Sequence, residues 1–160
     1  MRQSPDFSTL LDEARKILQT KQEPLRAICE LLNAKVDHYN WVGFYFMNDE
    51  TRTLEIGPYM GLKTEHTKIP YGKGICGQVA NSAEIFVVDD VYEQDNYLAC
   101  SLETQAEIVV PLFLNKKLIG QIDIDSNDRN PFSKKDEEFL KTLCDLIAKY
   151  PESFSSHLPE

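Results

Sequence analysis

The chain has 160 residues, of which 42% are hydrophobic and 27% charged, a composition that is ordinary for globular proteins. Because domains commonly run to ~100–200 residues, we expect residues 1–160 to form a single domain. The formal net charge of −9 and the isoelectric point near 4.8 argue against DNA, RNA or an anionic membrane as a partner.

The N-terminal residues lack the apolar run of a signal peptide, and no stretch approaches the ~20 apolar residues of a membrane helix. We therefore expect a cytoplasmic protein whose thiols stay reduced. No two cysteines form a CxxC pair and no histidine lies at zinc-finger spacing, so we expect no metal site. The four cysteines are Cys29, Cys76, Cys100 and Cys144.

Two helices are predicted first, at about 8–20 and 24–35. Ser8 fits the N-cap of the first helix, and Pro24 suits the first turn of the second. Cys29 belongs to the apolar stripe of the second helix, and buried free cysteine behaves as a small hydrophobe. We interpret Cys29 as a core residue.

Strands are predicted from Asn40 onward, where aromatic and β-branched residues alternate with turn residues. A glycine-punctuated turn, Gly72–Gly77, interrupts them and precedes a short helix. A last helix at 134–149 has Ser133 as its cap and Cys144 in its apolar stripe, so Cys144 is also interpreted as a core residue. The expected strands are 41–47, 53–59, 68–70, 84–89, 107–114 and 118–125.

This order of elements predicts an α+β fold with a central, mostly antiparallel sheet. The terminal helices should cover one face of the sheet, which leaves the other face for loops that bind a ligand. Cys76 and Cys100 lie in those loops. Residues 90–105 form a long polar segment around Cys100, and such segments are often functional. A reactive thiolate and a surface cysteine without function are both consistent with this position.

Three acidic residues lie on the last two strands. In Ile122-Asp123-Ile124-Asp125 the period of two places both aspartates on one face of the sheet, and Glu107 begins the neighbouring strand. Carboxylates on one face repel each other unless they bind a cation or a ligand ammonium, or share a proton. The alternative is a face exposed to solvent.

The glycine-rich turn carries weaker signals. It lacks the lysine–serine pair of a phosphate-binding loop, so nucleotide binding is not expected there. The dipole at the helix N-terminus could lower the pKa of Cys76, or the side chain could be buried beneath the turn. We interpret His66 as solvated, and His38 and His157 carry no signal.

Together these residues resemble the GAF-domain family of free methionine-(R)-sulfoxide reductases. The resemblance covers about residues 41–126, and the flanking helices fit less specifically. The matching stretches are Trp41-Val-Gly-Phe-Tyr45, Leu54-Glu-Ile-Gly-Pro58, Ile69-Pro-Tyr-Gly-Lys-Gly-Ile-Cys-Gly77, Leu98-Ala-Cys100, Glu107-Ile-Val-Val-Pro111 and Leu118-Ile-Gly-Gln-Ile-Asp-Ile-Asp-Ser126.

The resemblance implies a thiol-dependent reduction of free L-methionine-(R)-S-oxide through a sulfenic acid. It implies no bound cofactor and an external reductant, either a thioredoxin-like protein or a small thiol. It places the catalytic cysteine on Cys100, a second family cysteine on Cys76, pocket residues on Trp41 and Tyr45, and ligand-binding carboxylates on Glu107, Asp123 and Asp125.

The chain departs from the family pattern at two places. His66 occupies the usual position of a resolving cysteine, and Ser101-Leu-Glu-Thr104 replaces an aspartate followed by small residues. Cys100 could therefore be recycled through a disulfide with Cys76, which we favour, or directly by an external thiol.

Two non-enzymatic alternatives remain. One is a GAF sensor or small-ligand-binding module, although a free-standing chain without an output domain argues against signalling. The other is a structural module that forms a homodimer through its terminal helices. The reductase is the function that we expect.

Overall fold

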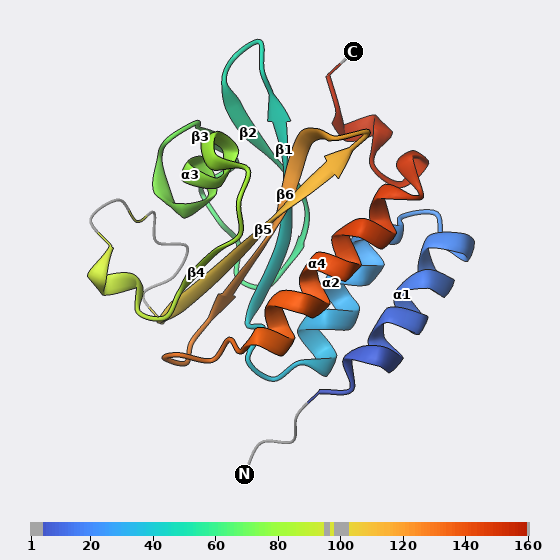
Figure 1. Cartoon of the computed structure of the whole chain (residues 1–160), viewed down its shortest axis with the longest axis horizontal. Coiled ribbons are helices and arrows are strands. Elements are labelled where there is room, and N and C mark those ends of the chain that lie inside the picture. Colours follow the sequence, from blue (N-terminus) through green and yellow to red (C-terminus); the bar gives the residue numbers. More distant parts are fainter. Residues whose placement is uncertain (1–4, 95–96, 98–102, 160) are drawn as a thin grey trace.

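The computed structural model describes residues 5–94, 97 and 103–159, and Cys100 lies outside them. Its centre is a six-stranded sheet with the strand order β3-β2-β1-β6-β5-β4, in which every neighbouring pair is antiparallel (Figure 1). The expected α+β fold with an antiparallel sheet is confirmed. The strands are β1 Trp41–Asn48, β2 Thr53–Met60, β3 Lys68–Pro70, β4 Phe86–Val88, β5 Ala106–Leu114 and β6 Lys117–Ser126.

Within residues 5–94, 97 and 103–159, four α-helices flank this sheet on its two sides. Figure 1 shows α1, α2 and α4 together on one side and α3 on the other. Within the described residues, no helix combines the length and the apolar character that crossing a membrane requires. The helices are α1 Phe7–Thr20, α2 Pro24–Lys35, α3 Gly74–Ser82 and α4 Lys134–Ala148.

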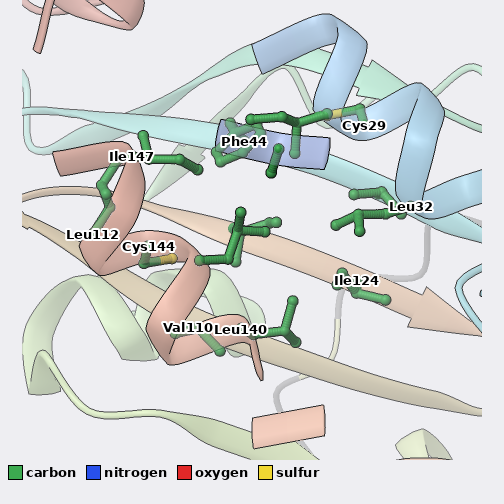
Figure 2. Close-up of a cluster of buried hydrophobic side chains, with 14 of the residues drawn as sticks. Cys29, Leu32, Phe44, Val110, Leu112, Ile124, Leu140, Cys144 and Ile147 are labelled. Carbon is green, nitrogen blue, oxygen red and sulfur yellow. The ribbon is translucent and has the colours of Figure 1, made fainter. Parts of the chain in front are cut away.

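The main hydrophobic core lies between the sheet and α1, α2 and α4. Leu32 of α2 and Leu140 of α4 meet Phe44 and Ile124 of the sheet in this core, as Figure 2 shows. Cys29 and Cys144 lie among these side chains and are buried. Their interpretation as core residues is confirmed.

Local capping explains where the helices begin. Asp6, not the expected Ser8, caps α1, and its carboxylate accepts a hydrogen bond from the backbone N–H of Thr9 at 3.1 Å. Ser133 caps α4 as expected, and Asp136 at the third helical position completes a capping box. Such a cap contributes about 1 kcal/mol to the stability of a helix.

A second apolar cluster lies on the opposite face of the sheet, where α3 packs against β2, β3, β5 and β6. It contains Trp41 and Tyr45 of β1 and Cys76 and Val79 of α3. The sheet is therefore buried on both faces, and the candidate site residues that the structure describes belong to the face that α3 covers. We call it the α3 face.

Candidate functional site

The register of three neighbouring strands brings the acidic residues together on the α3 face. Asp125 of β6 pairs with Trp41 of β1 on one side and with Glu107 of β5 on the other. Asp123 lies two residues along β6, on the same face. All three carboxylates are buried, with 4% of Glu107 and 1% of Asp123 and of Asp125 exposed. The alternative of a solvent-exposed acidic face is wrong, because α3 covers it.

Helix α3 places Cys76 directly against this carboxylate cluster. The Sγ atom of Cys76 lies 3.8 Å from Oε2 of Glu107. The donor atoms of Cys76, Glu107 and Asp123 all lie within 4.8 Å of one another. The three residues line a cavity together with Tyr45, His66, Ile69, Lys73, Gly74 and Ile75.

Burial controls the ionisation of this cluster. It raises the pKa of the Cys76 thiol well above its usual range, and the carboxylates of Asp123 and Glu107 raise it further. Of the two alternatives for Cys76, burial is the one that the structure shows, and the N-terminus of α3 does not lower this pKa. A helix dipole contributes ~0.3–1 kcal/mol, which is too little to offset desolvation and two neighbouring negative charges.

The pKa of Asp123 is also raised by burial, although hydrogen bonds with Glu107 and Cys76 oppose part of this rise. One oxygen of Asp123 has no hydrogen-bond partner among the described residues. A buried carboxyl group with an unsatisfied oxygen is stabilised when it binds a proton or a ligand. The cluster is therefore suited to hold a proton and a cationic group.

A divalent cation would require a different protonation state of the same donors. A thiol and two carboxylates could in principle bind one, but only the deprotonated thiolate is a ligand. The raised pKa of Cys76 opposes that deprotonation. When no cation is bound, Cys76 therefore keeps its proton beside Glu107 and Asp123.

Aromatic side chains of β1 and β2 form a wall beside the carboxylates. The ring of Trp41 stacks on Tyr59 at 5.2 Å and on Tyr45 at 6.4 Å between ring centres. The indole N–H of Trp41 donates to the carbonyl oxygen of Leu62 at 3.0 Å, which fixes the ring. Gly43 makes this stacking possible, because a Cβ there would lie 2.4 Å from the Trp41 ring.

Tyr45 connects this wall to His66, the residue at the position where the family usually has a resolving cysteine. Its hydroxyl donates to the backbone carbonyl of His66 at 2.8 Å. His66 is half-buried and lines the cavity, so its side chain is only partly solvated. Two polar backbone atoms of the β2–β3 connection thus anchor Trp41 and Tyr45.

Several residues at the site carry no signal in the sequence. Tyr59 reaches Trp41 because β2 pairs it with Gly43, and only the register of two strands reveals this. A second cavity of about 200 Å³ adjoins the carboxylates through Trp41 and Asp125. Its other lining residues are Asn40, Leu62, Glu103, Thr104 and Asn127.

The predicted nucleophile, Cys100, lies outside the described residues. The described residues nearest to it in sequence lie at the α3 face. Tyr97 contacts the apolar cluster of that face, and Glu103 and Thr104 line the second cavity beside Trp41. The role of Cys100 therefore remains a prediction from the sequence.

The chain is similar to proteins of known family. The family model of the GAF domain matches residues 7–150. The free methionine-R-sulfoxide reductase of Escherichia coli is 33% identical over 144 residues, which cover 90% of this chain and 83% of that protein. The enzyme of the same name from Saccharomyces cerevisiae is 44% identical over 112 residues, covering 69% of this chain and 62% of that protein.

Solved structures agree in fold. The free methionine-R-sulfoxide reductase of Neisseria meningitidis, determined in complex with its substrate, superposes with a TM-score of 0.87 at 27% identity, covering 99% of this chain and 98% of that chain. The reduced form of the fRMsr of Staphylococcus aureus gives a TM-score of 0.85 at 32% identity, covering 94% and 99%. The chain therefore belongs to the GAF domain family and, within it, to the free methionine-R-sulfoxide reductases.

Proposed function

We propose that this protein reduces free L-methionine-(R)-S-oxide to L-methionine, with thiols as the source of electrons. The observation that carries the proposal is the buried carboxylate cluster, in which one oxygen of Asp123 has no partner among the described residues. The membership of the chain in a family of reductases for this substrate supports it.

The substrate is a small zwitterion with a polar S=O group. Its ammonium group would be held by the negative charge of Glu107 and Asp125, which are buried side by side on β5 and β6. Trp41 and Tyr45 would contact the methyl group on sulfur through their ring faces. This division of the pocket would orient the sulfoxide oxygen towards Asp123.

Asp123 is the group best placed to donate a proton to the sulfoxide oxygen. Its raised pKa means that the protonated form persists to higher pH than in an ordinary aspartate. A hydrogen bond from this acid would stabilise the negative charge that develops on oxygen as the S=O bond breaks. General acids of this kind typically contribute ~10²–10⁴-fold to a rate.

Cys100 would be the nucleophile. Its thiolate would attack the sulfur atom of the activated sulfoxide. The oxygen would then pass to the cysteine sulfur, and methionine would leave. The thiol is oxidised by two electrons to a sulfenic acid while the sulfoxide is reduced by two. Two equivalents of an external thiol, from a thioredoxin-like protein or a small thiol, would then return the cysteine and release water and a disulfide.

The external thiols that this cycle requires indicate the compartment in which the protein would act. External thiols that can complete it are maintained in the cytoplasm, where cysteines stay reduced. We therefore place the proposed activity there, with the substrate and the reductant as the partners of the protein.

The test is a thiol-coupled assay with the separated R and S forms of free methionine sulfoxide. We expect wild type to turn over the R form in preference to the S form, and Cys100→Ser to release no methionine. Cys144→Ser is the matched control, because Cys144 is buried in the core on the opposite face of the sheet, and it should retain activity. Equal activity in Cys100→Ser and wild type would contradict the proposal.

A further inference from the structure

Cys76 is held rigidly at the start of α3. The side-chain amide of Gln121 donates to the carbonyl oxygen of Cys76 at 3.2 Å. The next residue, Gly77, hydrogen-bonds to Gly72 at 2.8 Å through its carbonyl and to Lys73 at 2.9 Å through its N–H. A Cβ at Gly77 would lie 2.7 Å from the carbonyl of Pro70. The backbone of Cys76 thus has little freedom to move towards another segment.

The sulfur of Cys76 points to the carboxylates. It lies 3.8 Å from Oε2 of Glu107, and the residue is only 4% exposed. A thiolate in this position would lie beside two buried negative charges, whereas a neutral S–H can donate to them. The raised pKa of Cys76 agrees with a thiol that keeps its proton.

We propose that Cys76 is a positioning residue for the reduction, whose single S–H donates to the Glu107–Asp123 carboxylate pair and thereby orients the acid that faces the sulfoxide. Cys76 then takes no part in recycling, and an external thiol RSH attacks the Cys100 sulfenic acid directly. The first RSH forms a mixed disulfide with Cys100 and releases water, and the second RSH restores the Cys100 thiol and releases RSSR. This inference rests on the proposed function, and it differs from the internal disulfide that the sequence favours.

The proposal predicts a shift in pH dependence. A hydrogen bond donated to a carboxylate favours its ionised form, so removing the thiol should raise the pKa of Asp123. The proposed acid must be protonated to act, and its activity is lost as the pH rises through its pKa. The alkaline limb of the first-turnover rate should therefore move to higher pH. The titratable and charged groups that face Cys76 are Glu107 of β5, Asp123 and Asp125 of β6, and Tyr45, His66 and Lys73 along the cavity.

Two substitutions separate positioning from disulfide chemistry. Cys76→Ala removes both the hydrogen-bond donor and the thiol, whereas Cys76→Ser removes the thiol and keeps an O–H donor. Methionine release in the first turnover should fall by about 10-fold in Cys76→Ala, as expected for the loss of one hydrogen bond to a charged group. Cys76→Ser should recover most of that loss, and both variants should continue to turn over with dithiothreitol.

Cys144→Ala is the matched control, since burial also raises the pKa of the Cys144 thiol but no carboxylate of the cluster faces it. It should leave both the first-turnover rate and the pH profile unchanged. Thermal unfolding of each variant reports whether it is folded. If Cys76→Ala does not fold, peptide mapping of wild type and Cys76→Ser still decides whether Cys76 forms a disulfide with Cys100.

Peptide mapping after one equivalent of the R sulfoxide provides the second measurement. A trappable sulfenic acid on Cys100, with Cys76 left as a free thiol, supports the proposal. A Cys76–Cys100 disulfide in wild type, or a Cys76→Ala variant with a wild-type first turnover and pH profile, would overturn it. Absence of any Cys100-dependent methionine release in wild type would instead refute the proposed function itself.

Discussion

In the proposed reaction, Asp123 is the residue that supplies the proton. This side chain lies on the α3 face between the partners Glu107 and Cys76, and it is almost fully buried. Burial raises its pKa, and the two partners limit that rise by hydrogen bonding. An aspartate in such surroundings keeps its proton to a higher pH than an exposed aspartate with a pKa of ~3.9 does.

The buried carboxylates of Glu107 and Asp125 should contribute to substrate binding, whereas exposed carboxylates should not. We expect Glu107→Gln and Asp125→Asn each to lower kcat/KM by about 10²-fold or more, because each removes a buried negative charge that would pair with the substrate ammonium. Steady-state kinetics with the R sulfoxide measure this effect. Asp145→Asn is the control, since Asp145 is exposed on α4. Wild-type kcat/KM in both site variants would exclude the carboxylates from binding.

At the scale of elements, a buried polar contact joins the start of β1 to α4. The Nε2 atom of His38 lies 2.7 Å from Oδ1 of Asp136, and the hydroxyl of Tyr39 donates to the same oxygen at 2.8 Å. The second carboxylate oxygen accepts from the backbone N–H of Ser133 at 2.9 Å. One carboxylate thus caps α4 and fixes that helix against the segment that leads into the sheet.

This contact should make stability depend on pH. Burial alone would raise the pKa of Asp136, but the hydrogen bonds from His38, Ser133 and Tyr39 outweigh it and hold the pKa below its usual range. The stabilisation is therefore fully present above the unfolded pKa of ~3.9 and is lost as the pH falls through the lower folded value.

We expect Asp136→Asn to lower the free energy of unfolding at pH 7 by ~1–3 kcal/mol, with a smaller difference from wild type at pH 3. Urea unfolding at the two pH values measures the difference. Asp145→Asn on the same helix provides the comparison for an exposed carboxylate. An equal loss of stability at both pH values would show that the ionised form of Asp136 is not what stabilises the fold.

At the scale of the whole molecule, one face of the sheet packs into the hydrophobic core and the opposite face, the α3 face, carries the candidate site. Ile122 and Ile124 enter the core beneath α1, α2 and α4, while Asp123 and Asp125 lie on the α3 face. The two sets alternate along a single strand, β6. Stability and activity should therefore respond separately to substitutions at adjacent positions.

Ile124→Val and Asp123→Asn test this separation. The first should lower the free energy of unfolding by ~0.5–1.5 kcal/mol and leave kcat/KM unchanged, because it removes a methylene from the core face only. Asp123→Asn should lose activity. It should gain stability relative to wild type as the pH rises, because ionising an acid of raised pKa disfavours the folded state. Thermal unfolding at pH 4, near the unfolded pKa of ~3.9, and at pH 9, together with kinetics, checks both. Parallel losses of stability and activity in both variants would contradict the separation.

The sequence was sufficient to predict those features that local patterns determine. Alternation in residues 122–125 placed both aspartates on one face, and the apolar stripes of the helices identified Cys29 and Cys144 as core residues. Burial of that acidic face was not predictable, because α3 covers it only in the folded chain. For the same reason the sequence left open whether the helix N-terminus lowers the pKa of Cys76 or the side chain is buried, and desolvation in the folded chain raises this pKa.

Contacts between distant residues were also missed. His38 and Asp136 are separated by 98 positions, and no local pattern relates them. His66 was interpreted as solvated because it has no partner nearby in the sequence, yet the fold brings it to the cavity beside Tyr45. The pairing of strands and the placing of helices, which set these contacts, depend on the packing of the whole chain.

The alternation along β6 has a consequence for how the protein can change over generations. A strand repeats every two residues, so inserting or deleting one residue within β6 would exchange its two faces. Isoleucines would then enter the pocket and carboxylates would enter the core, and both folding and reactivity would fail together. Length changes in this strand should be eliminated by selection, whereas the Asn115-Lys116 turn before it, which lies at the surface, can absorb them.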